Sequence, residues 1–196
     1  MDLTLKVVLP TDRTKAGTLT LVNPATGLVL FGPVPVLGRA ARNTATAHNN
    51  PTGNSLQPFG DTPKGTYDIA RIVGNGSGTS RPTNVYGQSG SIVLDPTGGD
   101  ALTAKNNGRI GLLIHSGRHA FSSVVDAKAL KPTNGCIRML DFDMGQLITA
   151  IKNNGLLFPG KVTVDIGGAP GPQGDIDESV DEGDPPPTQG GPVVLP

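Results

Sequence analysis

Apolar residues recur in short runs along the first 166 positions, and these runs predict β-strands. Alternating or continuous apolar runs cover 3–9, 18–22, 28–36, 66–73, 91–94 and 109–115, and a last run covers 161–166. The segment 23–27 predicts a turn between the second and third runs, and 106–108 predicts a hairpin tip before the run that ends at His115. The pattern indicates a mainly β domain over residues 1–166.

One stretch follows a helical period instead. Four apolar residues repeat at the spacing of a single buried helix face, and Asp141 stands where it could cap the helix. The segment 153–155 ends in a glycine, which favours the left-handed turn that stops a helix. We therefore expect one or two short helices beside the strands, one of them burying Met144, Leu147, Ile148 and Ile151.

Composition agrees with a turn-rich β protein. The chain has 28 glycines, 18 prolines and 4% aromatic residues among 196, and the polar segments 39–61 and 74–90 read as long loops of the kind that often carry function. No apolar run approaches the roughly 18 residues of a membrane span. The N-terminal residues lack the features of a secretory signal, so we expect no cleaved leader, and work outside the cytoplasm would need another delivery route.

The net charge of zero divides unevenly. Residues 1–164 hold 16 basic and 9 acidic side chains, a net charge of +7, whereas 165–196 hold seven acids and no base. We expect 167–196 to be a disordered acidic tail or linker rich in Gly and Pro. The basic residues of the body are dispersed rather than interleaved with aromatics, which argues against a nucleic-acid partner.

The chain has a single cysteine, Cys136, directly after Thr133, Asn134 and Gly135. These turn residues place the sulfur on a bend, where backbone N–H groups can point at an oxyanion that forms beside it. A free thiol needs a base or a positive charge to become a good nucleophile. His115 ends the strongest apolar run, which would fix its position; a buried cysteine and a hydrogen-bonded core histidine are the structural alternatives.

These residues resemble the active-site signature of the L,D-transpeptidase catalytic domain (YkuD type). The signature is a histidine at a strand end, a gap, and a Gly-Cys-apolar-Arg segment; here 114–117 read IHSG and 135–138 read GCIR, with 20 residues between His115 and Cys136. The stretch 62–67, TPKGTY, matches the entry into a core strand of that domain. The resemblance covers about 60–166, with 1–38 as its opening strands.

The resemblance implies a β-sandwich-like fold that acts on the stem tetrapeptides of peptidoglycan without a cofactor. Cys136 would attack the carbonyl before the terminal D-amino acid, and His115 would serve as general base. Ser116 and Gly117 would orient the imidazole, and Gly117 would also lie at the substrate. The N–H groups of Gly135 and Cys136 would stabilise the oxyanion.

The same resemblance places Thr133, Asn134 and Arg138 at the substrate. Arg138 would support the loop or meet a carboxylate, with a surface salt bridge as its alternative. The family usually has histidine where this chain has Asn134, which leaves the outcome open between transpeptidation, D-amino-acid exchange and carboxypeptidation. Similar antibacterial effectors are injected into a competitor's periplasm by a type VI secretion system, so we expect action in the periplasm or cell wall and an immunity or secretion-system protein as a partner.

Two other kinds of function stay open, a zinc enzyme and a module without catalytic activity. His115 and His119 have the four-residue spacing of zinc enzymes and Cys136 could add a ligand, although the glutamate of the zincin pattern is absent. The other class is a non-catalytic wall-binding or structural module in which Cys136 is only packed.

Overall fold

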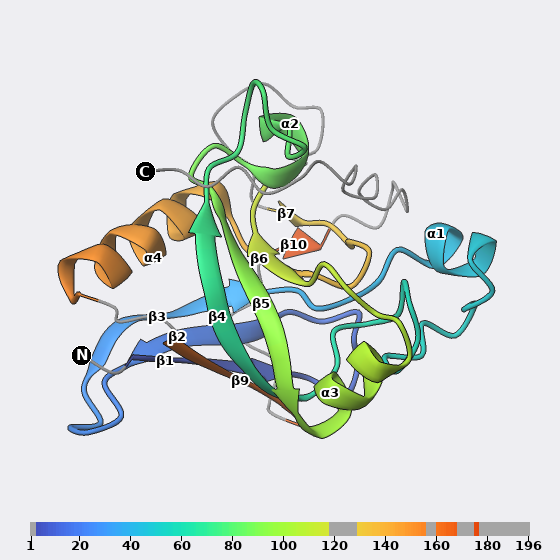
Figure 1. The fold of residues 1–196 in the computed structure, drawn as a ribbon, viewed down its shortest axis with the longest axis horizontal. Helices are drawn as coiled ribbons and strands as arrows, with labels where there is room; N and C mark the ends of the chain where they lie inside the picture. The colour runs from blue at the N-terminus through green and yellow to red at the C-terminus, as the bar shows by residue number, and fades with distance from the viewer. Residues whose placement is uncertain (1–2, 118–128, 156–159, 168–174, 177–196) are drawn as a thin grey trace.

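The computed structural model describes residues 3–117, 129–155, 160–167 and 175–176, and its architecture is mainly β, as the sequence predicts. Eight strands form one sheet in the order β3-β2-β1-β9-β4-β5-β6-β8 (Figure 1). Their bounds are β1 Thr4–Leu9, β2 Gly17–Val22, β3 Val29–Val36, β4 Gly65–Val73, β5 Ser91–Gly98, β6 Leu113–His115, β8 Ile137–Arg138 and β9 Gly160–Ile166.

The two ends of this sheet meet, which gives it a barrel-like form rather than two separate layers. Leu37 follows β3 at one end, and Arg138 belongs to β8 at the other. The two residues exchange backbone hydrogen bonds, Leu37 N to Arg138 O at 2.9 Å and Arg138 N to Leu37 O at 2.8 Å. The segment that leaves β3 is thereby fixed against the strand that follows Cys136.

The last strand of the main sheet lies in its middle. β9 pairs in parallel with β1 and antiparallel with β4, so the N-terminal hairpin joins the rest of the sheet through a segment from the other end of the chain. Alternate residues of these strands, such as Leu5, Val7, Val162 and Val164, are at most 1% exposed. Their burial is the period-two pattern expected of strands with one face in a core.

The predicted helix is confirmed as α4, Asp141–Asn153, and its four predicted apolar residues are buried in the main core. Gly155 has a φ of 60°, the left-handed conformation expected after the helix. The prediction that Asp141 caps this helix is wrong, because Leu140 occupies the N-cap position and makes no side-chain hydrogen bond to the helix end. The Asp141 carboxylate instead accepts a hydrogen bond from the Ser116 hydroxyl.

Three more helices stand where the sequence analysis expected loops or a hairpin, so the described residues hold four helices rather than one or two. The segment 106–108 is not a hairpin tip, because it holds the last residue of α3, Gly99–Asn106, and the C-cap residue Asn107. α1, Arg42–Ala47, and α2, Thr83–Tyr86, lie inside the two predicted long loops.

Most of the acidic tail lies outside the described residues, so its predicted disorder stays a prediction. The tail residues that the structure describes are Gly167 and β10, Asp175–Ile176, and β10 pairs in parallel with β7, Ala129–Leu130. Among the residues that the structure describes, no helix combines the length and apolarity needed to cross a membrane.

Candidate active site

The pairing of β6 with β8 places His115 and Cys136 on the same face of the sheet. The strands are parallel, with Ile114 opposite Ile137 and His115 opposite Arg138. Both isoleucines are fully buried in the main core, so residues one position away point to the opposite face. Continuing the register one residue before β8 sets Cys136 opposite Leu113, so Cys136 and His115 are diagonal neighbours on one face.

The imidazole of His115 is fully buried and its orientation is set by a backbone carbonyl. Its Nδ1 lies 2.8 Å from the carbonyl oxygen of Ser116. Because a carbonyl oxygen can only accept, Nδ1 must carry the proton in this bond. In the neutral ring Nε2 is then the unprotonated nitrogen, which is the form a general base requires.

Cys136 is partly exposed and lies at the border of a small apolar cluster. Cys136 packs against the cluster of Val85, Tyr86 and Leu113, and its Sγ lies 3.8 Å from the carbonyl oxygen of Gly111. The Tyr86 ring also contacts the His115 imidazole, with ring centroids 4.9 Å apart. The cluster that contains Tyr86 therefore contacts both His115 and Cys136.

The turn before the cysteine is held by Thr133, which is fully buried. Its hydroxyl accepts a hydrogen bond from the Gly135 N–H at 2.9 Å and donates to the Cys136 carbonyl oxygen at 3.0 Å. Thr133 thus shapes the turn, and its predicted place at the substrate stays a prediction. The Gly135 N–H, assigned to the oxyanion, is used inside the turn.

Gly135 has a further reason to be glycine. Its φ of 95° lies in the left-handed region, and an added Cβ would overlap the Gly60 carbonyl oxygen and the Arg109 guanidinium. The turn can therefore approach the 55–60 segment only without a side chain at this position.

Two residues that sequence reasoning missed support the same turn. The Thr62 hydroxyl donates to the Gly135 carbonyl oxygen at 2.9 Å, and Arg109 Nη2 lies 3.2 Å from that oxygen. Burial lowers the pKa of Arg109 to about 10, an effect opposed first by Tyr67 and then by Cys136. Thr62 is the first residue of the TPKGTY stretch, a motif that could have pointed to it, whereas no sequence motif points to Arg109.

Arg138 is 1% exposed, so the surface salt bridge considered for it is wrong. Its Nη1 donates to the Gly117 carbonyl oxygen at 2.9 Å, which ties β8 to the loop after His115. Gly117 has a φ of 89°, and an added Cβ would overlap the backbone of Val85 and Gly87. Both residues therefore support the loop after His115 through backbone contacts.

Ser116 supports the imidazole through its backbone and its side chain. Its carbonyl oxygen accepts a hydrogen bond from His115 Nδ1, while its hydroxyl donates one to the Asp141 carboxylate at the start of α4. Gly87 lies against both partners, because an added Cβ there would overlap the Ser116 hydroxyl and the carboxylate. A charged acceptor makes this bond stronger than a neutral one.

Asn134, which stands where the family has histidine, is part of a backbone crossing. It forms an isolated antiparallel bridge with Ala40, whose N–H donates to the Asp61 carboxylate at 2.8 Å. The side chain of Asn134 is amide and carries no charge, so it cannot exchange a proton with a substrate.

The other two histidines lie apart from this arrangement or outside the described residues. His48 is exposed and stacks on Phe59, with ring centroids 3.7 Å apart. His119, the second histidine of the zinc alternative, is outside the described residues. Among those that are described, no group of three His, Cys, Asp or Glu side chains is close enough to hold a metal ion.

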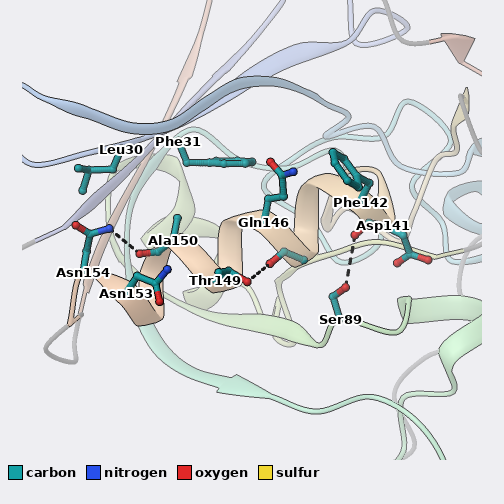
Figure 2. A pocket seen from close by; sticks show the side chains of 11 residues that line it. Leu30, Phe31, Ser89, Asp141, Phe142, Gln146, Thr149, Ala150, Asn153 and Asn154 are labelled. Atoms are coloured by element: carbon teal, nitrogen blue, oxygen red, sulfur yellow. Dashed lines mark hydrogen bonds between the residues drawn. The ribbon is translucent and has the colours of Figure 1, made fainter.

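A groove of about 810 Å³ lies on another part of the surface, between β3 and α4 (Figure 2). Leu30 and Phe31 line it from β3, and Figure 2 shows them across from Gln146 and Ala150 of α4. Neither His115 nor Cys136 lines this groove; Asp141 is the one residue it shares with the support of the imidazole.

Comparison with known proteins gives distant structural likenesses. No protein-family model matches the chain, and no curated protein matches it. Bd1075 of Bdellovibrio bacteriovorus is similar with a TM-score of 0.47 and 12% identity, covering 89% of this chain and 50% of that one. The helical cell shape determining protein Pgp2 from Campylobacter jejuni gives a TM-score of 0.41 and 15% identity, covering 86% and 50%. The chain thus spans about half the length of each, and likenesses at this level identify no family and no activity.

Proposed function

We propose that this chain is a cysteine-dependent enzyme that modifies peptidoglycan stem peptides through an acyl-enzyme, in the manner of L,D-transpeptidases. The observation that carries the proposal is the β6–β8 register, which puts His115 and Cys136 on one face, together with the Nδ1 bond that leaves Nε2 as the basic nitrogen. The resemblance of the IHSG and GCIR segments to that family supplies the substrate class.

In the first half of the reaction, His115 Nε2 takes the proton of the Cys136 thiol. The sulfur attacks the carbonyl carbon that joins the L-centre of the third residue to the terminal D-amino acid, and a tetrahedral oxyanion forms. The C–N bond then breaks, and the imidazolium gives its proton to the leaving amine. The products are the free D-amino acid and a thioester on Cys136.

In the second half, an amine or a water molecule attacks the thioester. His115 removes a proton from this nucleophile and returns it to the sulfur as the thiol leaves. An amine acceptor gives a cross-link or an exchanged D-amino acid, and water gives a trimmed tripeptide. Since the Asn134 amide cannot take a proton, we assign the proton transfers of both halves to His115.

The oxyanion needs a donor at the turn. Because the Gly135 N–H is bonded to Thr133, we assign this role to the Cys136 N–H, which belongs to the same residue as the nucleophile. Arg138 and Thr133 enter the proposal as supports of the two loops, and Ser116 as the residue whose carbonyl fixes the base.

The test is incubation with a purified tetrapeptide muropeptide, followed by chromatography and mass analysis of the products. We expect release of the terminal D-amino acid, its loss in Cys136→Ser, and a decrease of about 10²–10⁴-fold in His115→Gln. His48→Gln is the matched control, because this histidine is exposed and stacks on Phe59 in another part of the fold. Release that persists in Cys136→Ser contradicts the proposal.

The substrate class also places the activity in the periplasm or cell wall, as expected for an effector delivered there. Expression directed to the periplasm should slow bacterial growth, and the same chain kept in the cytoplasm should not. Equal growth in both compartments argues against the effector role while leaving the chemistry to the product assay.

A further inference from the structure

Arg109 joins two segments that are distant in the sequence. Its side chain enters the space between the 55–60 segment and the turn before Cys136, and the residue is 3% exposed. Nη1 donates to the carbonyl oxygens of Ser55 at 2.8 Å and Gln57 at 3.2 Å, and Nη2 donates to those of Gly60 at 2.6 Å and Gly135 at 3.2 Å. The planar, forked guanidinium is suited to such a set of acceptors.

These four acceptors are neutral carbonyls, so they solvate the guanidinium without cancelling its charge. The positive charge therefore interacts with nearby groups that can ionise. Burial lowers the pKa of Arg109, and the groups that raise it include Tyr67, Cys136 and Asp61. An interaction that favours the cation beside the sulfur equally favours the ionised sulfur beside the cation. The Asp61 carboxylate forms an ion pair with the Arg42 guanidinium at 3.1 Å and accepts a hydrogen bond from the Ala40 N–H.

We propose that Arg109 is a positioning residue of the Cys136 site, which fixes the Gly135–Cys136 turn against the 55–60 segment and supplies positive charge that favours the thiolate. A role of Arg109 in catalysis rests on the proposed function, because Arg109 would act through the nucleophile Cys136 and not by contacting the substrate. Among the described residues, the charged or titratable groups around Cys136 and its turn include Tyr86 of the cluster against which Cys136 packs, His115 from β6 and Arg138 from β8. Tyr67, Asp61 and Arg13 interact with Arg109.

The experiment measures alkylation of Cys136 by iodoacetamide as a function of pH. Cys136 is the only cysteine of the chain, so the reaction reports on this sulfur alone, and the uncharged reagent does not sense Arg109 directly. Rates are followed from about pH 5 to about pH 10, a range that spans the ordinary thiol pKa of about 8.5.

Three variants separate charge from structure. In Arg109→Met the midpoint of the rate profile should rise by about one pH unit, which slows alkylation at pH 7 about tenfold because the thiolate fraction falls by that factor. In Arg109→Lys the charge stays while the fork is lost, so the midpoint should stay within about 0.3 units of wild type. Arg13→Met is the matched control, since Arg13 also donates to two carbonyl oxygens, those of Gly38 and Thr62, both at 2.8 Å.

An unchanged midpoint in Arg109→Met overturns the proposal, and so does an equal rise in Arg13→Met, because the effect would then not be specific to Arg109. If Arg109→Met does not fold, as judged by circular dichroism, Arg109→Lys decides: a midpoint raised by about one unit overturns the charge role, and a wild-type midpoint with lowered stability supports both roles.

The product assay keeps this proposal apart from the proposed function. Wild-type protein that releases no D-amino acid, yet shows the Arg109-dependent midpoint, refutes the peptidoglycan activity and leaves the thiolate role of Arg109 standing. Release that is normal in Arg109→Met, with an unchanged midpoint, refutes the role of Arg109 and leaves the activity standing.

Discussion

Replacing Thr133 by valine tests whether the turn before Cys136 is held by one hydroxyl. The residue is fully buried, and valine keeps its shape while removing the acceptor of the Gly135 N–H and a donor to the Cys136 carbonyl oxygen. The Cys136 oxygen retains the Thr62 hydroxyl at 3.4 Å, whereas the buried Gly135 N–H loses its acceptor.

The structure sets the expected size of the effect. A lost hydrogen bond of average strength costs about 1 kcal/mol, and a buried N–H left without its acceptor costs about 1–3 kcal/mol. We therefore expect Thr133→Val to lower the free energy of unfolding by about 2–4 kcal/mol. For a chain of this size such a loss lowers the melting temperature by about 4–16 °C.

The assay is urea unfolding followed by circular dichroism, together with the alkylation rate of Cys136. Thr79→Val is the matched control: its hydroxyl also accepts from the N–H two residues later, that of Arg81 at 3.1 Å, and donates to a carbonyl oxygen, that of Gly76 at 2.8 Å, but the residue is exposed. The control should lose no more than about 0.5 kcal/mol. Equal losses in the two variants would contradict this prediction, since burial is what makes the Thr133 hydrogen bonds costly to break.

Three further changes test other parts of the structure. Asp141→Asn weakens the charge-assisted bond from Ser116, and we expect kcat for D-amino-acid release to fall about fivefold to tenfold with little change in KM. Gly117→Ala forces a side chain onto a φ of 89° and into the backbone of Gly87, so the free energy of unfolding should fall by about 2–4 kcal/mol. Leu147→Ala empties a fully buried position in the main core and should cost about 2–5 kcal/mol in a denaturant melt.

Each change has a control on the same kind of site. Asp143→Asn alters a carboxyl in the same first turn of α4, where burial raises the pKa and so disfavours the charge; release should stay at the wild-type rate. Gly108→Ala strains a φ of 86° with nothing within 4 Å of the added Cβ, so it should cost less than Gly117→Ala. Phe142→Ala removes a side chain that is 73% exposed and should leave stability within about 0.5 kcal/mol. If a control variant shows as large an effect as the variant it is paired with, the contact proposed for that variant is not the cause.

The strands and α4 were predictable because each has one buried face, and burial imposes a period on the sequence. The helix α3 was not, because its segment 99–106 is built mostly from small and polar residues, and its one large apolar residue, Leu102, is exposed. The Asn-Asn-Gly at its end suits a hairpin tip as well as a helix end. Closure of the sheet was also out of reach, since the bridge of Leu37 to Arg138 is made by backbone groups that any residue provides.

For the candidate site, the sequence predicted which groups matter better than what each one contacts. The strand end and the glycine turn pointed to His115 and Cys136, and the register places them on one face. Asp141 has a clear local pattern as a helix cap, yet its tertiary partner is Ser116. Arg109 follows a polar Asn-Asn-Gly and looks like a surface residue. Its acceptors lie 49 to 54 positions away in the 55–60 segment and 26 positions away at Gly135, which no local pattern encodes.

The acyl-enzyme is tested most directly by the mass of Cys136 after brief incubation with the tetrapeptide muropeptide, read from the tryptic peptide that contains this residue. We expect an added acyl group on the sulfur, of the mass of the substrate less its terminal D-amino acid, and no such group in a folded His115→Gln variant. An adduct that forms equally well without the imidazole, or D-amino-acid release with no adduct on Cys136 even after rapid quenching, would contradict the pairing of these two residues.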